Sequence, residues 1–225
     1  QYTFLDIEFI EAVDGSLLTK KELLFNQDKA FRIYGRTLSD GEIGCTLSHQ
    51  LCYRKIKDNN DEYALILEDD LFISDPKAIN VLEDIEKICN TSKPEIILLS
   101  GDYWWTRKSK IDNVYSIASV FDASCTHSYI INKRAAIALI VDVPYFIADD
   151  WLLFKRRIVL KALHPHLIDQ NRDDFKTEVH ASNIGIVRRK LSFKRNLYYY
   201  IIAIIKRLLN IIHHFEYKNF KNGRL

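Results

Sequence analysis

The chain has 225 residues, 48% of them hydrophobic, and a formal net charge of +2. This length suits one large domain with at most an appendage, and the near-neutral charge gives no reason to expect a nucleic-acid partner. The charge is uneven, because residues 186–225 carry a balance of +9 and leave −7 for residues 1–185, so the basic tail predicts an anionic partner.

The first predicted elements are a strand and a helix. Residues 4–16 alternate apolar and polar side chains and include Asp14-Gly15, a turn signal, so they predict a strand and a turn. Ser39 and Glu42 have the spacing of a capping box, which predicts a helix that starts there and ends at about Asp58.

Strands and helices are then expected to alternate. The predicted strands cover residues 63–67, 95–99, 127–132 and 157–163, and the predicted helices cover 74–90, 133–141 and 148–157. Continuous apolar runs are typical of strands buried on both faces of a parallel sheet. The alternation therefore predicts an α/β fold with a mainly parallel sheet, which binds ligands at the carboxyl ends of its strands.

Three carboxylates, Glu68, Asp69 and Asp70, directly follow the predicted strand 63–67 and interrupt an apolar run. Burying unpaired charges is costly, so this run needs a positive partner. In an extended chain Glu68 and Asp70 point to one side and Asp69 to the other. Two converging carboxylates predict a site for Mg²⁺ or Mn²⁺, which also binds substrate phosphates. A solvated acidic turn paired with lysines is the alternative.

Five short segments occur in an informative order. They are AVDG (12–15), GEIGCTLSH (41–49), LILEDDLFIS (65–74), SYIINKRAA (128–136) and DDWL (149–152). The set resembles glycosyltransferase family 25, which comprises lipooligosaccharide galactosyltransferases of Gram-negative bacteria and relatives that galactosylate collagen hydroxylysine. The resemblance extends from about residue 9 to residue 190.

This resemblance implies a GT-A-like, Rossmann-like domain over residues 1–190, with a UDP-sugar donor, most often UDP-galactose. The reaction is expected to be a metal-dependent inverting transfer of galactose to a lipooligosaccharide acceptor. Another UDP-hexose transferase and an inactive membrane-bound scaffold of the same fold are the alternatives. Family members usually begin with a V-I-N-L-like strand, and no such segment precedes Gln1, so we expect the first nucleotide-binding strand to be missing.

The family motif also implies roles for the acidic residues. Asp70 is expected to be the strongest metal ligand, with Glu68 on the metal or the donor, Asp69 on the donor, and His180 as a further metal ligand. Asp149 matches the family aspartate and is expected to be the base that deprotonates the acceptor hydroxyl, with Asp150 as the alternative. Helix capping is the competing explanation for this pair.

Other polar and aromatic residues are candidates for substrate binding. His49, Ser100 and Gln170 are expected to bind the donor, although a structural role for His49 is an open alternative. Neighbouring residues on a helix do not face each other, so Ser48 and His49 are not expected to form a nucleophilic pair. The expected acceptor-binding residues, with loop packing as the alternative, are Asp102, Trp104 and Trp105.

The tail, residues 191–225, is predicted to contain a basic amphipathic helix. Its apolar run Leu197–Ile205 has nine residues, far fewer than the roughly 20 that span a bilayer. Flanking lysines and arginines instead favour a helix that lies in a membrane interface. The family resemblance implies a lipid-linked acceptor, which places this interface at the cytoplasmic face of the bacterial inner membrane. Packing on the domain or a dimer contact is the alternative. Four cysteines without disulfide or zinc spacing predict reduced thiols, which also favours the cytoplasm.

Overall fold

The computed structural model describes residues 6–73, 81–82, 88–90, 92–170, 187–188 and 190–217. Its helices are α1 (Lys21–Leu24), α2 (Gln27–Tyr34), α3 (Asp40–Asn59), α5 (Lys133–Leu139), α6 (Trp151–Phe154) and α8 (Phe193–Ile211). Its strands are β1 (Tyr63–Leu67), β2 (Leu71–Ile73), β3 (Glu95–Leu98), β4 (Tyr103–Lys110), β5 (Ser116–Ala123), β6 (Ser128–Asn132), β7 (Val159–His164), β8 (Ile168–Gln170) and β9 (Phe215–Glu216).

The main sheet has seven strands in the order β1-β6-β3-β7-β5-β4-β9, and β2 pairs with β8 in a separate two-stranded sheet. The α/β class is confirmed, but the expected mainly parallel sheet is wrong, because within the described strands only β3 and β7 pair in parallel. β3 and β6 are buried at every position, as their apolar runs predict. A continuous apolar run indicates burial on both faces and leaves strand direction open.

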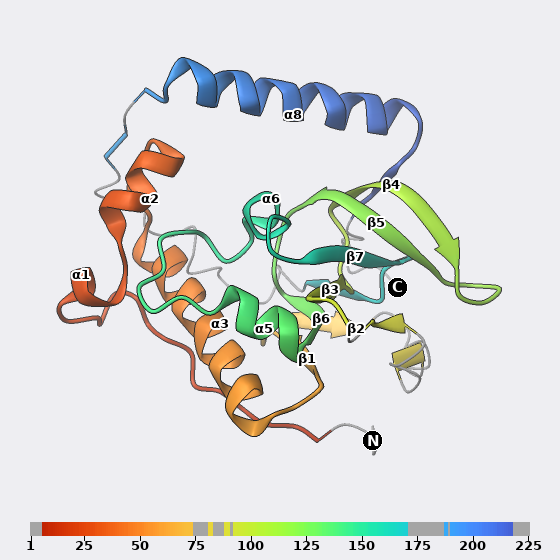
Figure 1. Cartoon of the computed structure of the whole chain (residues 1–225), viewed down its shortest axis with the longest axis horizontal. Coiled ribbons are helices and arrows are strands. Elements are labelled where there is room, and N and C mark those ends of the chain that lie inside the picture. The colour runs from red at the N-terminus through yellow and green to blue at the C-terminus, as the bar shows by residue number, and fades with distance from the viewer. Residues whose placement is uncertain are drawn as a thin grey trace, which may run out of the picture.

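Two apolar clusters cover the two faces of the sheet. Ile96 and Leu98 of β3 belong to the cluster that contains α3, α5 and α6 side chains, whereas Ile97 and Leu99 belong to the opposite cluster. This alternation follows the pleat of an extended strand. Figure 1 shows α3 and α5 lying against one side of the sheet. The covered sheet holds the loops at its ends in fixed positions.

The capping box at the start of α3 is confirmed. The Ser39 side chain accepts a hydrogen bond from Glu42 N, and the Glu42 carboxylate accepts one from Ser39 N. The helix ends at Asn59, within a residue of the prediction, and Asn60 follows in a left-handed conformation. Local side-chain chemistry therefore determines both ends of this helix.

The turn at Asp14-Gly15 is confirmed, but the strand predicted to precede it is not formed by residues 6–14. Phe9 is 94% exposed, and no described strand pairs with this segment. The turn packs against the start of α3, where a Cβ on Gly15 or Gly44 would lie within 2.4 Å of a backbone oxygen. The glycines of both motifs therefore permit a close backbone approach.

Other predicted elements are confirmed with shifts at their ends. The strands predicted at 63–67, 95–99, 127–132 and 157–163 correspond to β1, β3, β6 and β7, and the helix predicted at 133–141 corresponds to α5. The helix predicted at 148–157 shortens to α6, and the one at 74–90 lies largely outside the described residues. All four cysteines are free thiols.

The tail forms α8, which lies across the end of the body near β4 (Figure 1). Lys206 forms an ion pair with Asp122, and Trp104 Nε1 donates a hydrogen bond of 2.8 Å to Asn210 Oδ1. β9 then adds to the edge of the sheet beside β4. Among the described helices, none is both long and apolar enough to cross a membrane.

Candidate active site

Glu68 follows β1 and is held by hydrogen bonds from two other elements. Its Oε1 accepts a 2.6 Å hydrogen bond from Thr126 Oγ1 and lies 3.3 Å from His49 Nε2 on α3. His49 Nδ1 lies 2.7 Å from the Tyr129 hydroxyl, which fixes the ring. Burial opposes a charged imidazole, but the contacts with Cys45 and Glu68 raise the pKa of His49 to about 9. Burial likewise opposes the Glu68 charge, yet the contacts with His49 and Thr126 lower the pKa of Glu68.

Asp70 lies beside Gln170 because β2 pairs with β8. Leu71 is opposite Gln170 in the ladder, and Gln170 Nε2 donates a hydrogen bond of 2.5 Å to Asp70 Oδ2. The other oxygen, Asp70 Oδ1, is buried and has no hydrogen-bond donor within the described part of the chain. Burial, together with the charges of Glu68 and Asp69, raises the pKa of Asp70. A buried carboxylate oxygen in this state fits a divalent cation, which prefers oxygen ligands.

Asp149 and Asp150, the candidates for the general base, occupy different environments. Asp149 Oδ2 accepts a 3.2 Å hydrogen bond from Cys125 N, and burial raises the pKa of Asp149, reinforced by the charges of Asp150 and Glu42. Asp150 is the N-cap of α6 and also accepts a hydrogen bond of 2.6 Å from the Tyr34 hydroxyl. The capping explanation thus applies to Asp150, while Asp149 keeps the raised pKa that suits a general base.

Residues 124–127, between β5 and β6, connect these two groups of carboxylates. Cys125 N donates to Asp149, and the hydroxyl of the next residue, Thr126, donates to Glu68. Cys125 adopts φ 72°, and its carbonyl accepts a hydrogen bond from Trp151 Nε1 at 2.9 Å. Sequence reasoning missed Thr126; the only available signal was a short polar run before a buried strand.

The remaining predicted metal and donor residues lie at several places around the carboxylates. Asp69 lies in the turn between β1 and β2. Ser100 is buried at the end of β3 and bridges to Ile168 of β8, which places it beside the Gln170 strand. His180 lies outside the described residues.

Another combination of ligand atoms includes Glu68 without Asp70. Atoms of Cys45, His49 and Glu68 lie within 4.8 Å of one another. Cys45 and His49 are four residues apart on α3, so they share one face of the helix. Glu68 therefore belongs to this combination as well as to the acidic run Glu68-Asp69-Asp70.

The three predicted acceptor residues are not gathered together. The Asp102 carbonyl accepts a hydrogen bond of 2.9 Å from Ser124 N, so Asp102 lies next to residues 124–127. Trp104 packs beneath α8, with its ring 4.6 Å from that of Phe215. Trp105 is 4% exposed, because its ring packs with those of Tyr103, His164 and His214, and this leaves little ring surface for a sugar.

Comparison with known families identifies the family of this chain. Residues 2–152 match the family model described as "Glycosyltransferase family 25 (LPS biosynthesis protein)". The chain belongs to glycosyltransferase family 25. The resemblance inferred from the sequence motifs is thereby confirmed, and both Glu68-Asp69-Asp70 and Asp149-Asp150 fall within the matched residues.

Relatives of this family 25 chain come from animals and bacteria. It is 36% identical over 92 residues to a glycosyltransferase 25 family member of Aedes aegypti, and 32% identical over 96 residues to procollagen galactosyltransferase 2 of Mus musculus. Each match covers 37% of the chain and 15% of the relative. A Haemophilus influenzae protein named as a glycosyltransferase is 27% identical over 159 residues, which are 67% of the chain and 54% of that protein. The chain thus spans only part of these relatives.

Proposed function

We propose that this family 25 glycosyltransferase transfers galactose, with inversion, from UDP-galactose to a sugar of a lipooligosaccharide. The observation that carries the proposal is the connection made by Cys125 and Thr126, which hydrogen-bond to Asp149 and Glu68 respectively. An inverting transfer needs a cationic partner for the departing diphosphate and a base for the acceptor hydroxyl. A GT-A-like nucleotide-binding arrangement is part of this proposal.

Glu68 and Asp70 are the residues that would hold Mn²⁺ or Mg²⁺. The buried Asp70 Oδ1, which has no donor among the described residues, supports this assignment. When bound, the cation supplies positive charge that stabilises the departing diphosphate. Thr126 and His49 orient Glu68, and Gln170 orients Asp70, so both carboxylates are fixed before substrate arrives.

Asp149 is proposed as the general base. Its buried carboxylate has a raised pKa, which strengthens it as a proton acceptor, and the Cys125 amide fixes one of its oxygens. The proton of the acceptor hydroxyl passes to Asp149 as the oxygen attacks the anomeric carbon and the bond to UDP breaks. Asp150 acts beside it as the cap of α6 and as the acceptor for Tyr34.

The choices of donor and acceptor rest on the relatives. Procollagen galactosyltransferases support galactose as the transferred sugar, and the family description supports a lipopolysaccharide-type acceptor. A lipid-linked acceptor agrees with a second feature, the outer face of α8. Exposed apolar side chains recur there every three or four residues, so we include attachment of α8 to the inner face of the bacterial inner membrane in the proposal.

The decisive experiment measures UDP release from a panel of UDP-sugars, with Mn²⁺ and with chelator, using galactose-, glucose- and lactose-terminated acceptors. We expect release from UDP-galactose that requires both the metal and an acceptor. Asp70→Asn should reduce it at least 100-fold and abolish the rise in Tm that Mn²⁺ gives the wild type. Asp142→Asn, whose carboxylate is exposed and away from the proposed site, is the matched control for the loss of one charge.

Other results would select an alternative. Preference for a different UDP-sugar would replace galactose by another hexose. Binding of UDP without turnover of any donor would identify an inactive scaffold of the same fold. Near-wild-type release by Asp70→Asn would contradict the metal assignment.

A further inference from the structure

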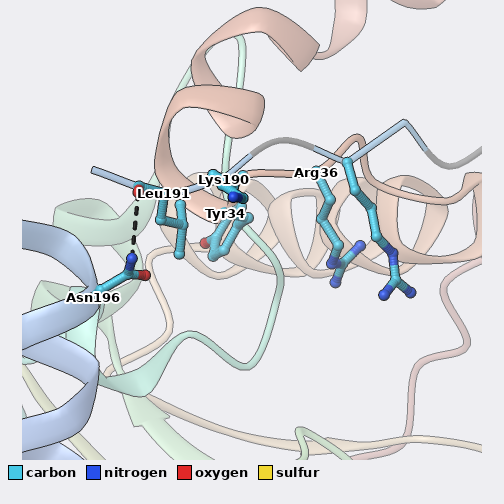
Figure 2. Close-up of a pocket in the computed structure, with 7 residues that line it drawn as sticks. Tyr34, Arg36, Lys190, Leu191 and Asn196 are labelled. Carbon is cyan, nitrogen blue, oxygen red and sulfur yellow. Dashed lines mark hydrogen bonds between the residues drawn. The ribbon is translucent and has the colours of Figure 1, made fainter. Parts of the chain in front are cut away.

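A cavity of about 520 Å³ lies where the end of α2 meets the segment that leads into α8. In Figure 2, Leu191, Lys190 and Tyr34 are seen between Asn196 and Arg36. The residues that line it are Tyr34, Gly35, Arg36, Arg188, Lys190, Leu191 and Asn196. This volume is within the usual range for small-molecule sites.

Backbone contacts fix the walls of the cavity. Arg36 and Arg188 form an antiparallel bridge, and Thr37 N donates a hydrogen bond of 3.0 Å to Val187 O. On the α8 side, Asn196 Nδ2 donates to the carbonyl of Leu191 at 3.3 Å, as the dashed line in Figure 2 marks. Two chain segments about 150 residues apart therefore build one concave surface.

The lining carries excess positive charge. Among the described residues, the lining includes three cationic side chains, Arg36, Arg188 and Lys190, and no carboxylate. Arg36 is neutralised by Glu42, which it contacts through two hydrogen bonds of 2.8 and 2.5 Å. For Arg188 and Lys190, no ion pair is found among the described residues. Two cations are thus left to attract an anion, and arginine favours phosphate in particular.

The cavity is connected to the candidate active site through Tyr34. The hydroxyl of this lining residue donates to Asp150 Oδ2 at 2.6 Å and accepts a hydrogen bond from Ile147 N at 3.2 Å. The charge of Asp149 also contributes to raising the pKa of Arg36, after the larger effect of Glu42. A ligand in the cavity would therefore lie nearer to the proposed base, Asp149, through the contact of Tyr34 with Asp150. Glu68 and Asp70 are instead contacted by Thr126, His49 and Gln170.

We infer that this cavity binds a phosphate group carried by the acceptor saccharide. The inference rests on the proposed function for the acceptor role, while the phosphate site itself is built by Arg188 and Lys190. Asn196 and Tyr34 also line the cavity and would lie beside the sugar. The outer face of α8 begins at Phe193, two residues after Leu191, so a lipid-anchored saccharide can reach the cavity from a membrane surface.

Calorimetry on the full chain tests the site directly, with glucose 6-phosphate and glucose as probes. We expect the wild type to bind glucose 6-phosphate at least tenfold more tightly than glucose. The double variant Arg188→Ala/Lys190→Ala should lose that difference. The matched control Arg107→Ala/Lys110→Ala removes two exposed cations from β4, which lies far from α2 in Figure 1, and should keep it. Equal binding of both probes, or no loss in the cavity variant, would overturn the inference.

Two further measurements distinguish a saccharide phosphate from the phosphates of UDP and of a lipid headgroup. UDP with Mn²⁺ should not displace glucose 6-phosphate, and the cavity variant should keep its affinity for UDP; displacement by UDP would instead assign the cavity to the donor. Phosphatidylglycerol vesicles test a lipid headgroup as the source. If the cavity variant loses vesicle binding but still binds glucose 6-phosphate as the wild type does, the saccharide assignment is overturned.

Kinetics separates this inference from the proposed function. With a phosphorylated acceptor, the KM of the cavity variant should be at least tenfold higher than that of the wild type. When phosphatase has removed the phosphate from the acceptor, the wild type should show the same higher KM. If the wild type transfers no sugar but binds glucose 6-phosphate through Arg188 and Lys190, the proposed transfer fails and the phosphate site stands. If it transfers sugar with one KM for both acceptors, the acceptor role of the cavity fails alone.

Discussion

Thr126 donates a 2.6 Å hydrogen bond from its hydroxyl to Glu68, although 58 residues separate the two in the chain. The Thr126 backbone neighbour, Cys125, holds Asp149 in the same stretch of loop. Glu68 has its other contact with His49 at 3.3 Å, which is longer. The hydrogen bond from the threonine hydroxyl is therefore the shorter of these two contacts of the Glu68 side chain. A displacement of this loop would move the hydrogen-bond donors of both Glu68 and Asp149.

Replacing Thr126 by valine should reduce transfer while leaving the fold intact. Valine keeps the branched shape but removes the donor to a charged acceptor, an interaction that is typically about 1.5–3 kcal/mol, or roughly 10- to 100-fold in rate. The measurement is kcat for UDP release together with the Mn²⁺ concentration for half-maximal rate. Thr126→Ser retains the hydroxyl and should restore most of the rate; equal losses in both variants would contradict a role for the hydroxyl.

Asp149 and Asp150 should respond differently to substitution. Asp149→Asn should lower kcat about 100-fold or more and leave UDP binding unchanged, because it removes a base and not a donor contact. Its Tm at neutral pH should hold or rise, because a buried carboxylate with a raised pKa destabilises the folded state when ionised. Asp150→Ala should instead lower the free energy of unfolding by about 1–2 kcal/mol through loss of the α6 cap and the Tyr34 hydrogen bond.

The pH profile of the wild type checks the same assignment. As pH falls, Asp149 becomes protonated and can no longer accept the proton. Because its pKa is raised, the rate should fall at a higher pH than the ordinary aspartate value of 3.8 would give. A fall that persists unchanged in Asp149→Asn would exclude Asp149 as its cause.

Features that depend on neighbouring residues in the chain could be predicted. The capping box of α3 and the turn at Asp14-Gly15 involve residues within a few positions of one another. The apolar runs at 95–99 and 127–132 predicted buried strands correctly. Strand direction was not predictable, because burial on both faces produces the same run in either direction.

Contacts between residues far apart in the chain could not be predicted from local sequence patterns. The hydrogen bond of Thr126 to Glu68 and that of Gln170 to Asp70 join positions 58 and 100 residues apart. The family resemblance predicted a donor role for Gln170, while Thr126 carries no residue-type signal of its own. The β4–β5 hairpin also escaped prediction, because the outer half of β4 is exposed and mostly polar.

The buried His166 should make stability depend on pH above neutrality. Its Nε2 lies 2.9 Å from Asp169 Oδ1 and its Nδ1 lies 2.8 Å from Glu216 Oε1. Burial opposes the charge, but the hydrogen bonds to both carboxylates raise the pKa of His166 to about 9 from 6.5. The stabilisation is thus complete below pH 6.5 and is lost as pH rises through 9, by up to roughly 3 kcal/mol.

Denaturant unfolding at several pH values measures this loss. The wild type should lose stability between pH 6.5 and 9, whereas His166→Gln should be less stable at pH 6.5 and should lose less over the same interval. His213→Gln, at an exposed position after α8, is the control and should follow the wild type. Parallel curves for the wild type and His166→Gln would refute the assignment of the titrating group.

The outer face of α8 should attach the protein to anionic vesicles. Its exposed apolar side chains are Phe193, Leu197, Tyr200, Ile201, Ile204, Leu208 and Ile211, whereas Leu209 on the inner face is 8% exposed. Lys194 and Arg207 add exposed positive charge. Burying such side chains at a membrane surface is favourable by about 1 kcal/mol or more for each one that is covered.

Point substitutions test this more sharply than removal of the tail, because β9 completes the sheet edge and supplies Glu216 to His166. Tyr200→Glu/Ile204→Glu/Leu208→Glu should weaken cosedimentation with phosphatidylglycerol vesicles at least tenfold, with UDP release on a soluble acceptor retained. Ser109→Glu/Asn113→Glu/Val114→Glu adds the same charge around the β4–β5 turn and should bind as the wild type does. If both triple variants lose vesicle binding equally, net charge accounts for the attachment; if neither does, α8 is not the membrane-binding face.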